Sequence, residues 1–202
     1  MAIKDRDRVD EHYARLAKKE GYPARSVYKL KEIDDSKRIL RPGHKVLDLG
    51  SSPGSWSLYA SRKAGMVVGV DLVAPAVPEG PKLSFLTHDI NTDPPQGLRA
   101  MAPFQVLLSD LAPKTSGQKA DDSLASLGLV RAALRWAALL LEKDGTMLFK
   151  FFQGEDSQSF LKEEASPLFG RLTLHRPKAV RKRSVELYAL CQGFKGVPDR
   201  KK

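Results

Sequence analysis

Four aspartates stand at the ends of short apolar segments of the chain, and this placement suggests a ligand site. They are Asp48, Asp71, Asp89 and Asp110. If the segments are parallel strands, their carboxyl ends meet at one edge of a sheet, where open α/β sheets bind ligands. A single aspartate at such a place usually only caps a turn, but four together line the edge with negative charge. Such an edge would repel a diphosphate and attract a ligand that carries positive charge.

The stretch GSSPGSW, residues 50–56, lies at this expected edge, directly after the first apolar segment. Its glycines leave room for a ligand to approach the backbone closely. The GxGxxG spacing of dinucleotide-binding loops is absent, and Pro53 removes one N–H group that a diphosphate could bind. Asp71 comes about twenty residues later, where a carboxylate can bind the two hydroxyls of a ribose, and Asp89 can accept from an exocyclic amine. S-adenosylmethionine, a nucleoside with a sulfonium charge, fits these features better than a nicotinamide dinucleotide.

The apolar segments alternate with helical patterns along the chain. They predict seven strands, at residues 45–50, 66–72, 83–90, 104–111, 146–152, 171–177 and 184–193. Helices are predicted from about residue 24 to 38 and at 55–65, 121–143 and 157–169. This alternation predicts an α/β fold with a mostly parallel seven-stranded sheet and helices on both faces. Because a short basic loop joins the last two strands, we expect them to form an antiparallel pair at one edge.

Length and composition describe a globular chain of one domain. Of its 202 residues, 42% are hydrophobic and 29% are charged, which is enough for a buried core. Cys191 is the one cysteine, and the four histidines lack the spacing of a metal site, so we expect neither a disulfide nor a metal. The N-terminus lacks the apolar segment of a signal peptide, and no apolar run approaches the roughly 20 residues that span a bilayer. We therefore expect a cytoplasmic protein without membrane contact.

Positive charge is concentrated at the two ends of the chain. Lysine and arginine number 34 against 24 acidic residues, which gives a net charge of +10. This excess predicts binding to a polyanion such as a nucleic acid, and a surface that only aids solubility is the alternative. We divide the chain into a basic N-terminal arm (1–23), a central domain (24–195) and a basic C-terminal tail (196–202).

Seven stretches of the sequence occur in an order and spacing typical of one enzyme family. They are RSVYKLKEID, VLDLGSSPGSW, VDL, HDI, LLSDLAPKTSG, FKFFQGE and RKRSVELYAL. The pattern runs from about Arg25 to Phe194 and resembles the FtsJ-like (RrmJ/RlmE-type) family of RNA 2′-O-ribose methyltransferases. One departure is Ser55, where the family usually has a second glycine before the tryptophan. The resemblance implies a Rossmann-like, S-adenosylmethionine-dependent methyltransferase fold for the central domain.

The resemblance also implies a catalytic tetrad and a set of cofactor contacts. The tetrad, which surrounds the reacting ribose in this family, corresponds to Lys29, Asp110, Lys150 and Glu186. The S-adenosylmethionine contacts correspond to Gly54, Trp56, Asp71, Asp89 and again Asp110. Taken alone, each lysine also fits a solvated surface position, and the tryptophan also fits a plain core position.

The chemistry of methyl transfer gives each tetrad member a task. A ribose 2′-hydroxyl is a poor nucleophile until a base removes its proton, and its oxygen must lie in line with the methyl group and the leaving sulfur. A lysine acts as a base only when its amine is uncharged, which burial and a second ammonium nearby both favour. We expect Lys150 to be this base, with Lys29 close by. Asp110 and Glu186 would orient the lysine and the hydroxyl, and the four groups would titrate together.

The substrate is implied by the same resemblance. Bacterial members of the family methylate a uridine of 23S ribosomal RNA in the large ribosomal subunit, and we expect the same here, with tRNA or another RNA as the alternative. A nicotinamide-dependent oxidoreductase is disfavoured by the missing GxGxxG, and a non-catalytic RNA-binding protein has no need for all four tetrad residues. We expect the basic segments 4–19 and 181–183 to contact RNA phosphates. We expect a monomer, because no long apolar face is left unexplained.

Overall fold

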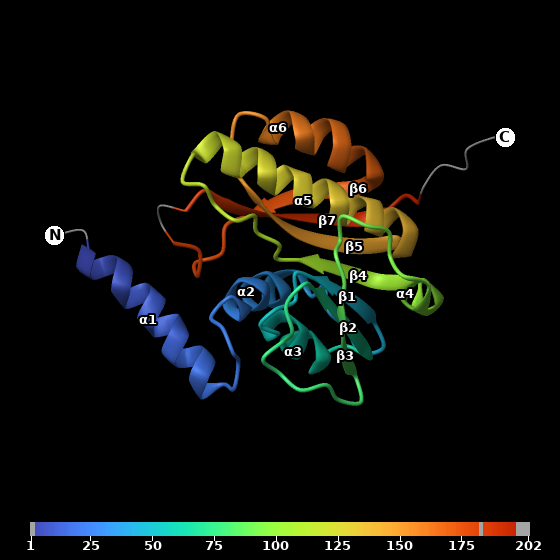
Figure 1. The fold of residues 1–202 in the computed structure, drawn as a ribbon, viewed down its shortest axis with the longest axis horizontal. Helices are drawn as coiled ribbons and strands as arrows, with labels where there is room; N and C mark the ends of the chain where they lie inside the picture. The colour runs from blue at the N-terminus through green and yellow to red at the C-terminus, as the bar shows by residue number, and fades with distance from the viewer. Residues whose placement is uncertain (1–2, 182–183, 197–202) are drawn as a thin grey trace.

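The centre of the protein is a seven-stranded sheet with the strand order β3-β2-β1-β4-β5-β7-β6 (Figure 1). It is seen in a computed structural model that describes residues 3–181 and 184–196. The strands are β1 (Lys45–Leu49), β2 (Met66–Asp71), β3 (Leu83–Thr87), β4 (Phe104–Ser109), β5 (Leu141–Phe152), β6 (Phe169–His175) and β7 (Glu186–Phe194). β1 to β5 pair in parallel, whereas β7 runs antiparallel to both β5 and β6. The predicted mostly parallel sheet with an antiparallel pair at one edge is confirmed.

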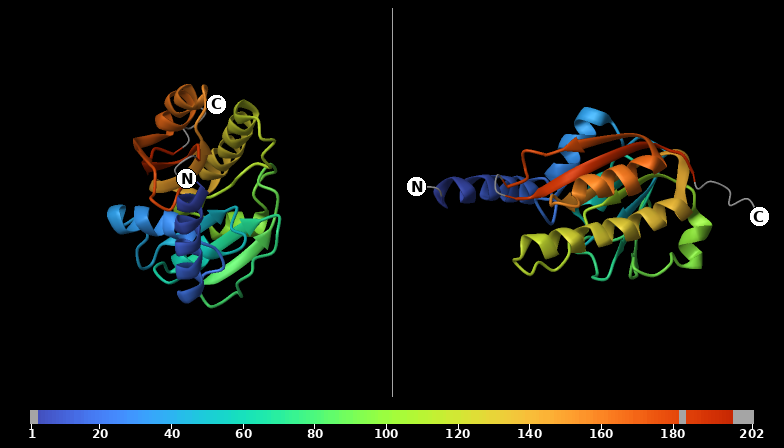
Figure 2. Two further views of the ribbon diagram at one scale, coloured as in Figure 1. Left: turned by 90° about the vertical axis from the view of Figure 1, so that its left-hand side faces the viewer. Right: turned by 90° about the horizontal axis from the view of Figure 1, so that it is seen from above.

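Helices cover both faces of the sheet (Figure 1). One face carries α2 (Val27–Lys37) and α3 (Ser55–Ser61), and the other carries α5 (Lys119–Leu140) and α6 (Ser157–Phe160). α6 continues into a π-helical turn (Leu161–Ala165) and a 3₁₀ turn (Ser166–Leu168). The short α4 (Gln96–Met101) precedes β4, and α1 (Ile3–Lys19) projects from the body of the protein (Figure 2).

Alternating side chains along the strands divide the core into two clusters. On β4, Leu107 belongs to the cluster beneath α5, whereas Val106 and Leu108 belong to the cluster beneath α2 and α3. Both faces are buried, which is why these strands are continuous apolar runs in the sequence. On β5, Leu148 faces the α2 side, and Lys150, two residues later, points to the same side. The sheet therefore directs this lysine toward α2.

Some local elements differ from the sequence-based expectation. The helix predicted to reach residue 143 ends at Leu140, and β5 begins at Leu141 without a connecting loop. Leu141 pairs with Phe104 of β4, and the register then shifts, as in a β-bulge. Cross-strand pairing thus extends the strand backward over residues that a periodicity argument assigns to a helix and a loop. α1 and α4 have no counterpart among the predicted elements, and α1 forms within the basic arm.

α5 resembles a membrane span only in composition. Among the residues that the structure describes, it is the one helix long and apolar enough to cross a bilayer, with a mean hydropathy of 1.3. More than half of that apolar stretch is buried inside the protein, and the helix packs on β4 and β5. Burial of this kind is typical of a core helix, and the expected lack of membrane contact stays a prediction.

Candidate functional site

The four predicted tetrad residues come from three neighbouring strands and one helix, and they meet at one edge of the sheet. Asp110 follows β4, and Lys150 lies near the end of β5. Because β7 runs antiparallel to β5, its first residue, Glu186, lies where β5 ends. Lys29 comes from the first turns of α2, on the side of the sheet toward which Lys150 points.

Two ion pairs hold the tetrad together. Lys150 Nζ lies 3.0 Å from Asp110 Oδ1, and it donates a hydrogen bond to the Asp110 carbonyl oxygen at 2.7 Å. Lys29 Nζ lies 2.6 Å from Glu186 Oε1. None of the four side chains is more than 16% exposed. Charge-assisted contacts in such a shielded place fix both amines in position.

Tyr188 connects the two ion pairs, although no sequence pattern singles it out. Its hydroxyl oxygen lies 2.9 Å from Asp110 Oδ1 and 2.8 Å from Glu186 Oε1, and its side chain is fully buried. Burial, together with the two neighbouring carboxylates, raises the pKa of Tyr188 well above its ordinary value. The hydroxyl therefore stays protonated and donates its one hydrogen bond to either carboxylate, one at a time.

Strand pairing is the signal that identifies Tyr188. It follows Glu186 by two residues on β7, so both side chains point to the same side of the sheet. It also stands directly opposite Lys150 in the β5–β7 ladder. The spacing is visible in the sequence, but the ladder partner is known only once the register of the two strands is known.

Trp56, which belongs to α3, is predicted to contact the cofactor. Its side chain lies in the core, against the start of α2. It is 3% exposed, and its indole N–H donates a hydrogen bond to the Ser26 carbonyl oxygen at 2.9 Å. Its ring centroid lies 5.9 Å from that of Tyr188. These contacts hold the beginning of α2, and with it Lys29, close to the other three tetrad residues. A cofactor contact by the Trp56 side chain stays a prediction.

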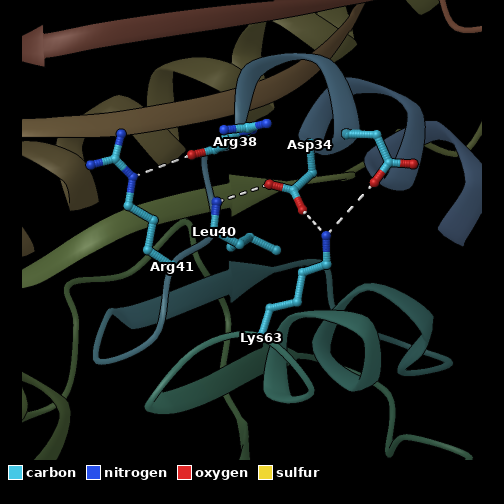
Figure 3. Close-up of a pocket in the computed structure, with 6 residues that line it drawn as sticks. Asp34, Arg38, Leu40, Arg41 and Lys63 are labelled. Atoms are coloured by element: carbon cyan, nitrogen blue, oxygen red, sulfur yellow. Dashed lines mark hydrogen bonds and ion pairs between the residues drawn. The ribbon is translucent and has the colours of Figure 1, made fainter.

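The other end of α2 is held by a buried carboxylate, Asp34 (Figure 3). Asp34 accepts hydrogen bonds from the Leu40 N–H at 2.9 Å, the Tyr59 hydroxyl at 2.9 Å and the Lys63 amine at 2.7 Å. Tyr59 lies in α3 and Lys63 follows it, so this cluster ties α2 to α3. A pocket of about 460 Å³ adjoins the cluster. Several lining residues, such as Leu40 and Arg41, precede β1 in the sequence, so the pocket lies near the N-terminal end of β1. The tetrad lies at the opposite edge of the sheet.

Gly54 lies in the loop between β1 and α3, and Asp71, the last residue of β2, lies beside this loop. Gly54 has φ +109°, and a side chain at this position would collide with Val77. Both the backbone conformation and the nearby Val77 side chain therefore favour glycine at position 54. Asp71 accepts hydrogen bonds from the Ser52 N–H at 2.9 Å and the Val73 N–H at 3.0 Å. These two bonds fix the carboxylate beside the loop.

The remaining acids differ in exposure. Asp89 is half-buried after β3, and its Oδ1 accepts two hydrogen bonds of 2.9 Å from Asn91. Asp48 is fully buried within β1, and its Oδ2 accepts a 2.5 Å hydrogen bond from Ser57. Among the described residues, nothing bonds to Asp48 Oδ1. Burial raises the pKa of Asp48 to about 7. Asp48 therefore lies beneath the edge of the sheet rather than on it, contrary to the expectation of four acids along one edge.

Comparison with known proteins shows which family this arrangement belongs to. The sequence model of the FtsJ-like methyltransferases matches residues 22–194. The chain belongs to the FtsJ-like methyltransferase family. The family and the methyltransferase activity predicted from the motifs are thereby confirmed.

Several relatives of this FtsJ-like methyltransferase carry more specific names. A ribosomal RNA large subunit methyltransferase E from Oleidesulfovibrio alaskensis is 40% identical over 195 residues, which is 94% of each chain. The protein of the same name from Legionella pneumophila is 37% identical over 195 residues and 93% of each chain. The crystal structure of a ribosomal RNA methyltransferase from Plasmodium falciparum matches with a TM-score of 0.72 and 25% identity, over 87% of this chain and all of that one.

Proposed function

We propose that this methyltransferase uses S-adenosylmethionine to methylate a ribose 2′-hydroxyl of RNA, a uridine of 23S ribosomal RNA in the large ribosomal subunit. The observation that carries the proposal is the pair of buried lysine–carboxylate contacts joined by Tyr188 at the edge of the sheet. The names of relatives about 40% identical support ribosomal RNA as the substrate class. A net charge of +10 suits a polyanionic substrate.

The residues beside the tetrad suit S-adenosylmethionine. Asp48 has a buried oxygen with no partner in the described part of the chain, and the charges of Asp110 and Asp71 lie close enough to raise its pKa. Three carboxylates in one place favour a ligand with a cationic sulfur or an amine. Asp71 would hold the ribose and Asp89 the adenine. When bound, the cofactor supplies a methyl group activated by its positive sulfur.

In this proposal Lys150 first releases the proton that makes it the cationic partner of Asp110, and its uncharged amine then takes the proton of the ribose hydroxyl. Lys150 is 6% exposed, so water has little access to its amine, and two contacts to Asp110 fix the amine at the edge of the sheet. Lys29 and Glu186 approach from α2 and β7 and would orient the ribose. Tyr188 holds the two carboxylates in fixed relation to each other.

The test of this assignment is methyl transfer to large ribosomal subunits from cells that lack the enzyme. We expect the wild-type protein to methylate them and Lys150→Ala to lose about 10²- to 10⁴-fold in kcat, the usual contribution of a general base. Its affinity for S-adenosylmethionine should change less than about twofold, because the amine contacts the acceptor side. Substantial turnover by a folded Lys150→Ala protein would remove the base assignment.

Asp71→Ala should have the opposite effect. Removing a carboxylate that binds ribose hydroxyls should weaken S-adenosylmethionine binding by about tenfold or more, since hydrogen bonds to charged groups contribute about 1.5–3 kcal/mol. With saturating cofactor, kcat should stay near that of the wild type. Calorimetric titration of the cofactor measures the first effect, and methylation at high cofactor concentration measures the second. An unchanged affinity would place the ribose elsewhere.

Two further arms test the substrate and the cofactor. Unmodified tRNA offered in place of ribosomal subunits tests the RNA class, and methylation of tRNA alone would replace the proposed substrate while leaving the family assignment intact. Thermal unfolding with S-adenosylmethionine or with NAD tests the cofactor, because a ligand that binds the folded state raises the melting temperature. The cytoplasmic location and the monomeric state stay predictions.

A further inference from the structure

A second pocket, of about 550 Å³, lies between α1, α2 and the segment that follows β6. Its lining includes Tyr13, Glu20, Tyr28, Lys31, Glu32 and Lys178, and we call it the α1–α2 pocket. The Lys178 N–H donates a hydrogen bond to Glu32 Oε2 at 2.9 Å, which ties the segment after β6 to α2. Figures 1 and 2 show α1 beside α2, with its N-terminal half projecting past the sheet.

The α1–α2 pocket adjoins the tetrad. Glu32 follows Lys29 by three residues on α2, and residues at this spacing on a helix lie about 5–6 Å apart at their Cβ atoms. Lys29 itself pairs with Glu186 of the tetrad. A ribose held at the tetrad would therefore leave a neighbouring nucleotide within reach of the pocket. Basic residues in the second half of α1, such as Lys18 and Lys19, are exposed on the same helix and suit the phosphates.

Two tyrosines form the apolar part of the pocket. The ring centroids of Tyr13 and Tyr28 are 5.2 Å apart with an angle of 35° between the rings. Lys31 Nζ lies 5.8 Å from the centroid of the Tyr28 ring. Tyr28 is 6% exposed, whereas Tyr13 is only partly buried and keeps accessible surface. A partly exposed tyrosine backed by a second ring is the kind of surface on which unpaired RNA bases stack.

The polar groups of the pocket include two carboxylates and one tyrosine hydroxyl. The Tyr28 hydroxyl is buried and lies close to the Glu20 carboxylate, without a hydrogen bond of ordinary geometry to any described residue. Burial, with the Glu20 carboxylate nearby, raises the pKa of Tyr28 to about 12, so the hydroxyl stays a donor at neutral pH. Glu20 and Glu32 each contact a neighbour through Oε2. Glu20 and Glu32 thus give the pocket carboxylate acceptors, whereas the Tyr28 hydroxyl is buried beneath it.

We propose that the α1–α2 pocket binds one unpaired base of the RNA substrate, near the methylated ribose, stacked on Tyr13. The carboxylates of Glu20 and Glu32 would accept hydrogen bonds from an exocyclic amino group of that base. Adenine, cytosine and guanine carry such an amino group, and uracil does not. The pocket therefore favours an amino-bearing base over uracil. This inference rests on the proposed function, because it requires an RNA substrate.

The first test separates stacking from catalysis. The full chain methylates large ribosomal subunits from cells that lack the enzyme, and KM for the subunits is compared with kcat and with cofactor affinity. Tyr13→Ala should raise KM by about 5- to 150-fold, the range expected for loss of one base–aromatic stack, with kcat and cofactor affinity near those of the wild type. Tyr13→Phe keeps the ring and should recover most of the lost affinity. An unchanged KM for a folded Tyr13→Ala protein would overturn the proposal.

The second test reads the base itself. Subunits are prepared with each of the four bases at the two nucleotides on either side of the methylated ribose, and the methylation rate is measured for each. We expect one position at which uracil is disfavoured, and Glu32→Gln, which can still accept the hydrogen bond from the Lys178 N–H, should weaken that preference. Equal rates for all bases at every position would overturn the pocket assignment. Failure of the wild-type protein to methylate any RNA would instead overturn the proposed function.

Discussion

The Tyr188 hydroxyl stands between two carboxylates and can donate its single hydrogen to only one of them at a time. Asp110 and Glu186 each also pair with a lysine, so a movement of the hydroxyl hydrogen changes how strongly each ion pair is held. In a buried place such coupling is stronger than in water. At the scale of single residues, Tyr188 therefore acts as a positioning residue for the whole tetrad.

Tyr188→Phe should lower kcat by about 10- to 100-fold. The change removes a hydrogen bond to a charged group, which contributes about 1.5–3 kcal/mol, and each 1.36 kcal/mol is a factor of ten in rate. Cofactor affinity should change less than kcat, since Asp110 is the one predicted cofactor residue to which the hydroxyl bonds. Methyl transfer under saturating conditions measures kcat. Tyr59→Phe is the matched control: Tyr59 also donates to a buried carboxylate, Asp34, but it reaches the tetrad only through the packing of α2, so its loss of kcat should be smaller. Equal loss of kcat in both variants would contradict the assignment.

The four tetrad residues were implied by the resemblance to the FtsJ-like family, and the structure brings them together, while their catalytic roles stay predictions. Tyr188 could not be predicted, because its role depends on the register of β5 against β7, which pairs it with Lys150. Asp48 was expected at the edge because it ends an apolar run. It is the fourth residue of a strand that continues through Leu49, and burial follows from that position.

At the scale of elements, α2 carries Lys29 and is held at both ends. Trp56 donates a hydrogen bond to the Ser26 carbonyl oxygen, just before α2. Near the C-terminal end of α2, Asp34 accepts hydrogen bonds from Leu40 and Tyr59, which lie outside the helix. Arg38, which follows the helix, has the left-handed conformation with φ 51°, and its N–H bonds to the Asp34 carbonyl oxygen. The position of Lys29 thus depends on packing against α3 rather than on the helix alone.

Asp34→Asn should lower the free energy of unfolding by about 1–3 kcal/mol. The amide cannot accept all the hydrogen bonds that the carboxylate accepts, and it leaves a buried donor unpaired. The lost ion pair adds little, because Lys63 is 38% exposed and can turn to water. Urea unfolding measures the change. Asp35→Asn is the control, since Asp35 is 60% exposed and lies 3.7 Å from the same amine. If Asp35→Asn lowers the free energy of unfolding as much as Asp34→Asn does, then surface charge, and not the buried hydrogen-bond acceptor, determines the stability.

The central strands were predictable because they are buried on both faces and form continuous apolar runs, whereas the edge strands β3 and β6 are only partly buried. The boundaries of elements were harder to predict where pairing between strands overrides the local hydrophobic periodicity. One example is Leu141, which pairs with Phe104 of β4. The helix α1 was not predicted, since its highly charged sequence lacks a wide apolar face. Its second half packs on α2 through contacts such as that of Tyr13 with Tyr28, which depend on a segment that follows it in the chain.

At the scale of the whole molecule, stability should depend on pH through one buried carboxyl. The pKa of Asp48 is raised to about 7 in the folded protein by burial and by its acidic neighbours Asp110 and Asp71, against an ordinary value of 3.8. Between these two values the folded state holds more protons than the unfolded state. The free energy contributed by Asp48 therefore falls as pH rises from about 4 to about 7, and it is constant above that. His44 and His175, whose pKa values are lowered by burial, contribute with the opposite sign.

Asp48→Asn isolates this contribution, because the histidines titrate equally in both proteins. The difference in unfolding free energy between variant and wild type should shift in favour of the variant from pH 4 to pH 7, by an amount on the order of 4 kcal/mol at most. Urea unfolding of the cofactor-free protein at pH 4.5, 6 and 8 measures it. Asp121→Asn, at the exposed start of α5, should show no comparable trend. A difference that is independent of pH would mean that Asp48 is already charged in the folded protein across this range, and Asp48 would then need a permanent positive partner beside Asp71 and Asp110.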